Sequence, residues 1–133
     1  MKIYNSAFLE ISLSDNNMTI TNEWCKTTSE MTDEQYKTDM LKFSELALQH
    51  KPKYHLINSL QFLYAITLDM QDWTNKTIFP KLIEAGIKKI AFLVSSEMIA
   101  QLSIEQTLEE SNASIFAVKY FDKEELAKKW LLA

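Results

Sequence analysis

The chain has 133 residues, a net charge of −4 and a hydrophobic content of 47%. This length fits a single domain covering residues 1–133, and no stretch approaches the roughly eighteen consecutive apolar residues of a membrane span. All 14 basic residues are lysine. Because arginine supplies the planar donor fork that grips phosphates and guanine edges, an acidic chain without arginine is not expected to bind nucleic acid.

Cysteine content and the start of the chain indicate a cellular location. Cys25 is the only cysteine, so no internal disulfide can form. Residues 1–6 lack the apolar region of a secretory signal. Both features are typical of a cytoplasmic protein, which is the predicted location.

Alternating side chains predict an antiparallel hairpin near the start of the chain. Residues 9–13 alternate apolar with polar side chains, which is the period-two pattern of a half-buried strand. Residues 15–17 supply turn chemistry, and residues 18–24 alternate again as the returning strand. Residues 25–30 are predicted to be a polar connection.

The first helix has a clear start and a clear end. Thr32 and Gln35 match a capping box, in which each side chain bonds a free backbone N–H of the first turn. The helix is predicted to end near His50, because Pro52 prevents its continuation. Its predicted buried face consists of Tyr36, Met40, Phe43 and Ala47.

A second helix is predicted between Thr67 and Gly86. Thr67 is a suitable N-cap, Pro80 is expected to kink the helix, and Gly86 suits the left-handed residue that follows a helix end. The predicted buried side consists of Trp73, Ile78, Leu82 and Ile83.

Further strands alternate with these helices. Strands are predicted over residues 54–58, 87–94 and 115–121, and a helix capped by Ser95 or Ser96 is predicted between the last two. A final helix opens at Asp122, with Leu126, Ala127, Trp130 and Leu131 predicted to face the sheet. The element order is therefore β-β-α-β-α-β-α-β-α. It predicts an α/β fold with a five-stranded, mainly parallel sheet and an N-terminal antiparallel hairpin.

The opening hairpin, the four helices and the stretch from Tyr54 to Trp73 resemble the STAS and SpoIIAA-like group (sulphate-transporter and anti-sigma-factor-antagonist domains). The resemblance covers nearly the whole chain in element order. Members of the anti-sigma-antagonist branch carry an Asp-Ser-Ser/Thr-Gly turn with a phosphorylated serine, whereas residues 64–69 here read Tyr-Ala-Ile-Thr-Leu-Asp. The resemblance implies a small, non-enzymatic regulatory or binding module.

Polar residues where the strands end are candidate ligand or partner contacts. Ligands of open parallel sheets bind beyond the carboxyl ends of the strands, where Asn58, Ser59, Ser95 and Ser96 are predicted to lie. Thr67 is either a phosphate-accepting hydroxyl or a plain N-cap, and the cap is favoured. Asn58 and Ser59 are likewise contact residues or ordinary turn residues, and the turn is favoured.

Residues 60–66 are unusually apolar for a connection, and Phe62 and Tyr64 are the contact candidates there. Three interpretations remain open. The segment forms the contact of a homodimer, lines a small apolar pocket, or folds back on its own core.

Common catalytic signatures are absent from the sequence. A single glycine excludes the dinucleotide-binding, P-loop and nucleophile-elbow motifs. His50 and His55 flank a proline turn without further ligands, and Cys25 has no visible histidine partner, so no metal, cofactor or catalytic residue is predicted. The predicted function is that of a protein-interaction module with another protein or itself as partner. The alternative is a carrier or sensor of a small apolar or anionic ligand at Asn58, Thr67, Ser95 and Ser96, and an enzyme ranks third.

Overall fold

The computed structural model describes residues 1–97 and 117–133 of the chain. Within them, one sheet has six strands in the order β1-β2-β3-β4-β5-β6. Strands β1, β2 and β3 are antiparallel neighbours, and β3 to β6 run parallel to one another. The bounds are β1 (Lys2–Asn5), β2 (Leu9–Leu13), β3 (Thr19–Trp24), β4 (Tyr54–Asn58), β5 (Lys89–Leu93) and β6 (Ala117–Phe121).

The sheet is mixed, with an antiparallel hairpin at its start, as predicted, but the expected number of five strands is wrong because β1 was missed. Strand β1 has no clear alternation of apolar and polar residues, and its pairing with β2 is irregular between Lys2 and Tyr4. It is held by tertiary contacts. The Tyr4 hydroxyl donates a hydrogen bond of 2.8 Å to the buried Asp39 carboxylate, which also accepts one from Ser6.

Five helices are described. They are the 3₁₀ helix η1 (Lys26–Glu30), α1 (Asp33–His50), α2 (Leu68–Thr77), α3 (Phe79–Ala85) and α5 (Glu124–Leu132). Helix η1 lies within the polar connection expected at residues 25–30. The helix predicted after Val94 falls mainly on residues 98–116, outside the described residues.

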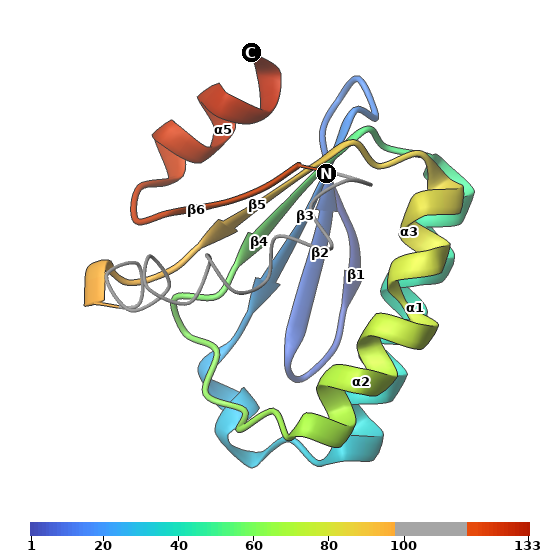
Figure 1. Ribbon diagram of the computed structural model, residues 1–133, viewed down its shortest axis with the longest axis vertical. Helices are drawn as coiled ribbons and strands as arrows, with labels where there is room; N and C mark the ends of the chain where they lie inside the picture. The colour runs from blue at the N-terminus through green and yellow to red at the C-terminus, as the bar shows by residue number, and fades with distance from the viewer. Residues whose placement is uncertain (98–116) are drawn as a thin grey trace.

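The helices form layers on both faces of the sheet. Helices α1, α2 and α3 cover one face, and α5 lies on the other against β4, β5 and β6 (Figure 1). The larger core lies under α1 and α3 and includes Leu9, Ile11, Ile20, Phe43 and Leu82. The smaller core, under α5, consists of Leu56, Ala91, Ala127 and Leu131.

The helix ends follow the sequence signals. The capping box of Thr32 and Gln35 is present, and Thr67 caps α2 through a hydrogen bond from the Met70 amide. Gly86 has a φ of 94°, the left-handed conformation in which a side chain is strained. These three predictions are confirmed.

The predicted kink is instead a break between two helices. Helix α2 ends at Thr77, and Pro80 lies in the first turn of α3, where a missing N–H does no harm. Two predicted buried positions are also wrong, since Ile83 and Leu126 are 41% and 50% exposed. Ile83 follows the buried Leu82 in α3, and Leu126 precedes the buried Ala127 in α5. The buried stripe of each helix is therefore narrower than predicted.

Candidate functional site

The four parallel strands end in line. Glu23, Asn58, Leu93 and Phe121 are successive partners across β3, β4, β5 and β6. The residues that follow them therefore emerge side by side, and we call this region the carboxyl end of the sheet. It is the place where open parallel sheets usually bind ligands and partners.

The segment that joins β4 to α2, residues 59–67, crosses this end without joining the sheet, and we call it the β4–α2 segment. Phe62, Tyr64 and Ile66 are partly buried against the core. Leu60 and Leu63 are 51% and 58% exposed, and Leu68, at the start of α2, is 82% exposed. The segment therefore folds partly onto its own core, as one of the three interpretations held, and still presents leucines to solvent.

An aromatic cluster holds the inner side of the segment. Phe62 packs on Trp24 of β3, and Tyr64 stacks on Tyr36 of α1, with ring centroids 5.0 Å apart in each pair. Tyr36 also contacts Trp24 and Trp73, both at 6.1 Å. Ring contacts of this kind stabilise a structure beyond the burial of their area. These ring contacts therefore hold the inner side of the segment against the core.

Hydrogen bonds fix the backbone of the segment. The hydroxyl of the buried Thr28, in η1, accepts a hydrogen bond from the Leu63 amide at 2.8 Å and donates to the Cys25 carbonyl at 2.7 Å. The Tyr64 hydroxyl donates to Asp33, in the first turn of α1. Nothing in the sequence singles out Thr28, because it lies in a polar stretch and its partner is 35 residues away.

The predicted site residues lie in three places along the chain. Asn58 and Ser59 are in the turn after β4, where the Asn58 side chain accepts from the Leu60 amide at 3.2 Å and the Ser59 amide donates to the Leu93 carbonyl. Ser95 and Ser96 follow β5, and the Ser96 hydroxyl donates to Asp122 at 3.0 Å. Phe62, Tyr64 and Thr67 belong to the β4–α2 segment, with Thr67 at its far end as the cap of α2.

A small cavity opens beside Asn58. It has a volume of about 100 Å³ and is lined by Glu23, Trp24, Asn58, Leu60 and Gln61. Small-molecule sites usually enclose roughly 300–1,000 Å³. The cavity therefore has room for a few water molecules or one small group. A larger groove of about 360 Å³ lies elsewhere, between α5 and strands β2 and β3.

Two ionisable groups near this end have raised pKa values. Burial raises the pKa of the Cys25 thiol, and the Glu10 and Glu23 carboxylates raise it further, so the weakly nucleophilic protonated form persists. Burial also raises the pKa of Tyr64, as does its hydrogen bond to Asp33. The described residues include no group of three histidine, cysteine, aspartate or glutamate side chains that could hold a metal ion.

The pKa of His55 is strongly perturbed. It is fully buried in β4, its ring stacks on Phe43 at 4.5 Å, and burial lowers its pKa to about 3. Neither ring nitrogen has a hydrogen-bond partner among the described residues. His55 lies inside the larger core, near the amino end of β4, and so is separate from the carboxyl end of the sheet.

A scan against protein-family models, a search of curated proteins and a search of solved structures each returned no match to this chain. In the part of the chain that the structure describes, no helix has both the length and the apolar character needed to cross a membrane.

Proposed function

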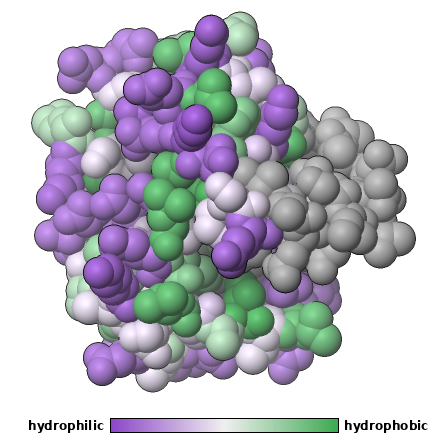
Figure 2. Space-filling model, turned by 90° about the vertical axis from the view of Figure 1, so that its left-hand side faces the viewer, coloured by the Kyte–Doolittle hydropathy of each residue, from purple (hydrophilic) through white to green (hydrophobic). Residues whose placement is uncertain are grey.

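We propose that the chain is a non-enzymatic, STAS-like interaction module of the cytoplasm that binds a protein partner through the β4–α2 segment. One observation carries the proposal. The segment exposes Leu60 and Leu63, and Leu68 is exposed at the start of α2, while the inner side of the segment is fixed by the aromatic cluster. Figure 2 shows hydrophobic side chains exposed in the lower part of the face on which this segment lies.

Physical reasons favour a partner over an accidental exposure. An apolar surface on a connection between a strand and a helix costs solubility, and contiguous apolar patches mark interaction sites. Because the segment is already ordered, a partner that covers it avoids the entropy cost of ordering a flexible loop. The element order of the STAS and SpoIIAA-like group, to which a regulatory role belongs, supports the same proposal.

A photo-cross-linking experiment tests the proposed function. Benzoylphenylalanine is placed at position 63 in the native cell, and at position 126 in a control, since Leu126 is also exposed but lies on α5. We expect a discrete protein adduct from position 63 alone. Equal adducts from both positions, or none from position 63, would contradict the proposal.

The second candidate function is binding of a small ligand at the carboxyl end of the sheet. The cavity beside Asn58 favours it, with Glu23 and Gln61 as polar lining residues. Its volume of about 100 Å³ restricts the ligand to a very small molecule or to one group of a larger one. Native mass spectrometry of the purified protein would reveal such a ligand as a mass increment that Asn58→Leu removes.

A further inference from the structure

The distribution of charge identifies the kind of partner, provided that the proposed interaction function holds. Residues 54–68 contain no lysine, aspartate or glutamate, and the one histidine among them is buried. The β4–α2 segment itself therefore carries no charge, although the exposed Glu23 lines the same cavity as Leu60. Any electrostatic preference must come from the residues that surround it.

Carboxylates dominate those surroundings. Four exposed acidic residues flank the β4–α2 segment in the chain or in space, and we call them the acidic rim. Glu30 ends η1, which contacts the segment through Thr28, and Asp69 is in the first turn of α2. The other two, Asp33 and Glu34, are in the first turn of α1, where Asp33 accepts the hydrogen bond from Tyr64.

The lysines of this region are fewer and partly engaged. Lys37 of α1 is half-buried and lies over the Trp73 ring at 5.7 Å, and Lys26 is exposed at the start of η1. Acidic residues in the first turns of α1 and α2 are also stabilised by the helix dipoles, which explains their presence without a partner. The helix dipoles do not require these residues to lie beside a segment that has no charge of its own.

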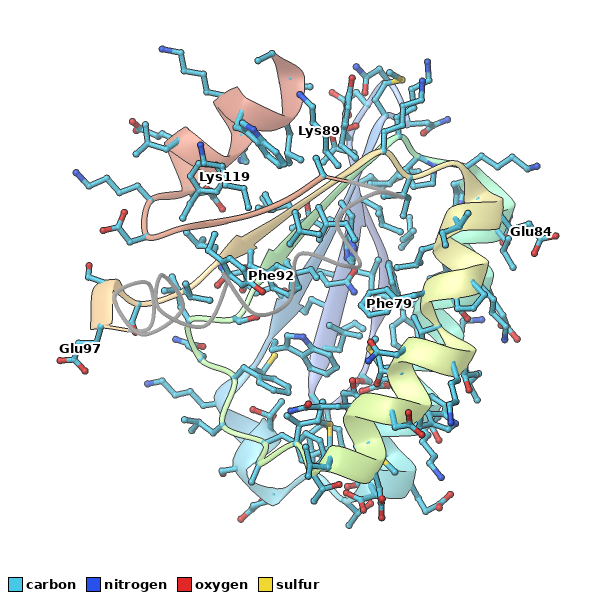
Figure 3. The ribbon with its side chains drawn as sticks, viewed as in Figure 1. Phe79, Glu84, Lys89, Phe92, Glu97 and Lys119 are labelled. Carbon is cyan, nitrogen blue, oxygen red and sulfur yellow. The ribbon has the colours of Figure 1, made fainter. Side chains whose placement is uncertain are left out.

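Two turns at the opposite end of the strands carry lysines. Lys51, Lys53 and Lys88 are exposed in the turns that lead into β4 and β5. In Figure 3, Lys89 lies near the top of the molecule, whereas Glu97, which follows β5, lies toward the lower left. Exposed lysines are therefore concentrated in the turns that lead into β4 and β5.

We infer that the partner of the β4–α2 segment presents apolar side chains within a basic segment, such as an amphipathic helix rich in lysine or arginine. Leucines would pack on Leu60, Leu63 and Leu68 while the basic side chains pair with the acidic rim. Complementary charge around an apolar centre raises the association rate and excludes wrong partners.

The same charges argue against two other occupants. A second copy docked through this surface by a two-fold axis would place one acidic rim against another, because such an interface is self-complementary. An anionic lipid surface would also be repelled by the rim.

Synthetic peptides test the inference directly. The probe is a fluorescent amphipathic peptide of leucine and lysine, about four helical turns long, and its counterpart has every lysine replaced by glutamate. Measured by fluorescence anisotropy, the basic peptide is expected to bind at least about tenfold more tightly than the acidic one, and its Kd should rise with salt.

Matched variants show whether binding uses this surface. Leu63→Ser should weaken binding of the basic peptide roughly tenfold, while Leu126→Ser, at the exposed leucine of α5, should not. Glu30→Lys with Glu34→Lys should abolish the preference for the basic peptide. Glu84→Lys with Glu45→Lys makes the same change in net charge on α3 and α1, at exposed positions outside the rim (Glu84 is labelled in Figure 3), and should preserve it.

Several outcomes would overturn the inference. In the peptide assay, they are equal binding of the two peptides, no binding of either, or an equal effect of the control variants. In sedimentation equilibrium, the contrary outcome is a dimer that Leu63→Ser dissociates. In a vesicle assay, it is binding to phosphatidylserine vesicles. If position 63 still gives a discrete protein adduct in the cell, the proposed interaction function survives and only the basic character of the partner is rejected. If that adduct is also absent, the proposed interaction function and the basic character of the partner are both rejected.

Discussion

The connections at the amino end of the parallel strands differ from those at the carboxyl end. At the amino end, residues 51–53 and 86–88 are short turns, each with a left-handed residue, Lys51 at φ 50° and Gly86 at φ 94°. At the carboxyl end, residues 25–32 and 59–67 are longer and include η1 and the aromatic side chains of the β4–α2 segment.

The connections at the two ends of the strands therefore have different structural roles. The turns at the amino end only reverse the chain, so their energetics depend on backbone conformation. The longer connections at the carboxyl end build a surface, so their energetics depend on packing between residues far apart in the sequence. Four predictions follow from this contrast, beginning with the largest expected effect.

Removal of the central ring at the carboxyl end should give the largest loss. Trp24 is 5% exposed and contacts both Phe62 and Tyr36. Trp24→Ala is expected to lower the free energy of unfolding by about 3–5 kcal/mol, because it leaves a cavity under the segment. Urea denaturation measures the loss. Trp130→Ala, at a partly buried ring on α5, should cost less, and an equal cost would contradict the central role of Trp24.

The amino end contains the residue that should make stability depend on pH. The pKa of His55 is lowered from 6.5 to about 3 by burial, so between these values the unfolded chain binds the proton that the folded chain does not. Stability from this group is complete above pH 6.5 and is lost as the pH falls toward 3.

The expected slope is at most about 1.4 kcal/mol for each pH unit in that window. Urea denaturation of the wild type and of His55→Leu at a series of pH values measures it. The variant should lose most of the slope, while His50→Gln, which keeps the buried histidine, should retain it. An unchanged slope in His55→Leu would show that other groups are responsible.

Loss of the Thr28 hydroxyl should loosen the β4–α2 segment. Thr28→Val removes the acceptor of the Leu63 amide and is expected to destabilise the fold by about 1–3 kcal/mol, since a buried donor is left without a partner. Amide hydrogen exchange at Leu63 should accelerate by a larger factor than exchange in β5. Thr28→Ser keeps the hydroxyl and serves as the control, and equal destabilisation by both variants would implicate the methyl group instead.

The left-handed residues of the turns before β4 and β5, Lys51 and Gly86, should respond in opposite directions. Gly86→Ala is expected to cost about 1–2 kcal/mol from backbone strain alone, because an added Cβ has no atom within 4 Å. Lys51→Gly should stabilise the protein by about 0.5 kcal/mol, because it relieves the strain already present at φ 50°. Thermal unfolding measures both shifts, and shifts of the same sign would reject this explanation.

The success of sequence prediction follows the same contrast. The ends of α1 and the positions of Thr67 and Gly86 were predictable, because caps and left-handed residues act within one helical turn. The hairpin of β2 and β3 was predictable from its period of two. Helix η1 and the hydroxyl of Thr28 were not, because their partners lie in a segment more than thirty residues away.

The β4–α2 segment shows why the candidate site was only partly predictable. Its apolar character is evident in the sequence, but Leu63 is as apolar as Phe62 and Tyr64, so the alternation of exposed and partly buried residues is hidden. Which side faces the core depends on where Trp24 and Tyr36 place their rings.

By itself, the sequence determined the α/β class, most strands, both ends of α1, the start of α2 and the end of α3, because these depend on local backbone preferences and on the periodicity of apolar side chains. Only the tertiary structure decided that residues 2–5 form the edge strand β1, that Asp39 and Thr28 are buried and hydrogen-bonded, and that Leu60, Leu63 and Leu68 face solvent within an acidic rim. The physical reason is that each of these depends on distant residues being brought together, and no local pattern encodes which residues will meet.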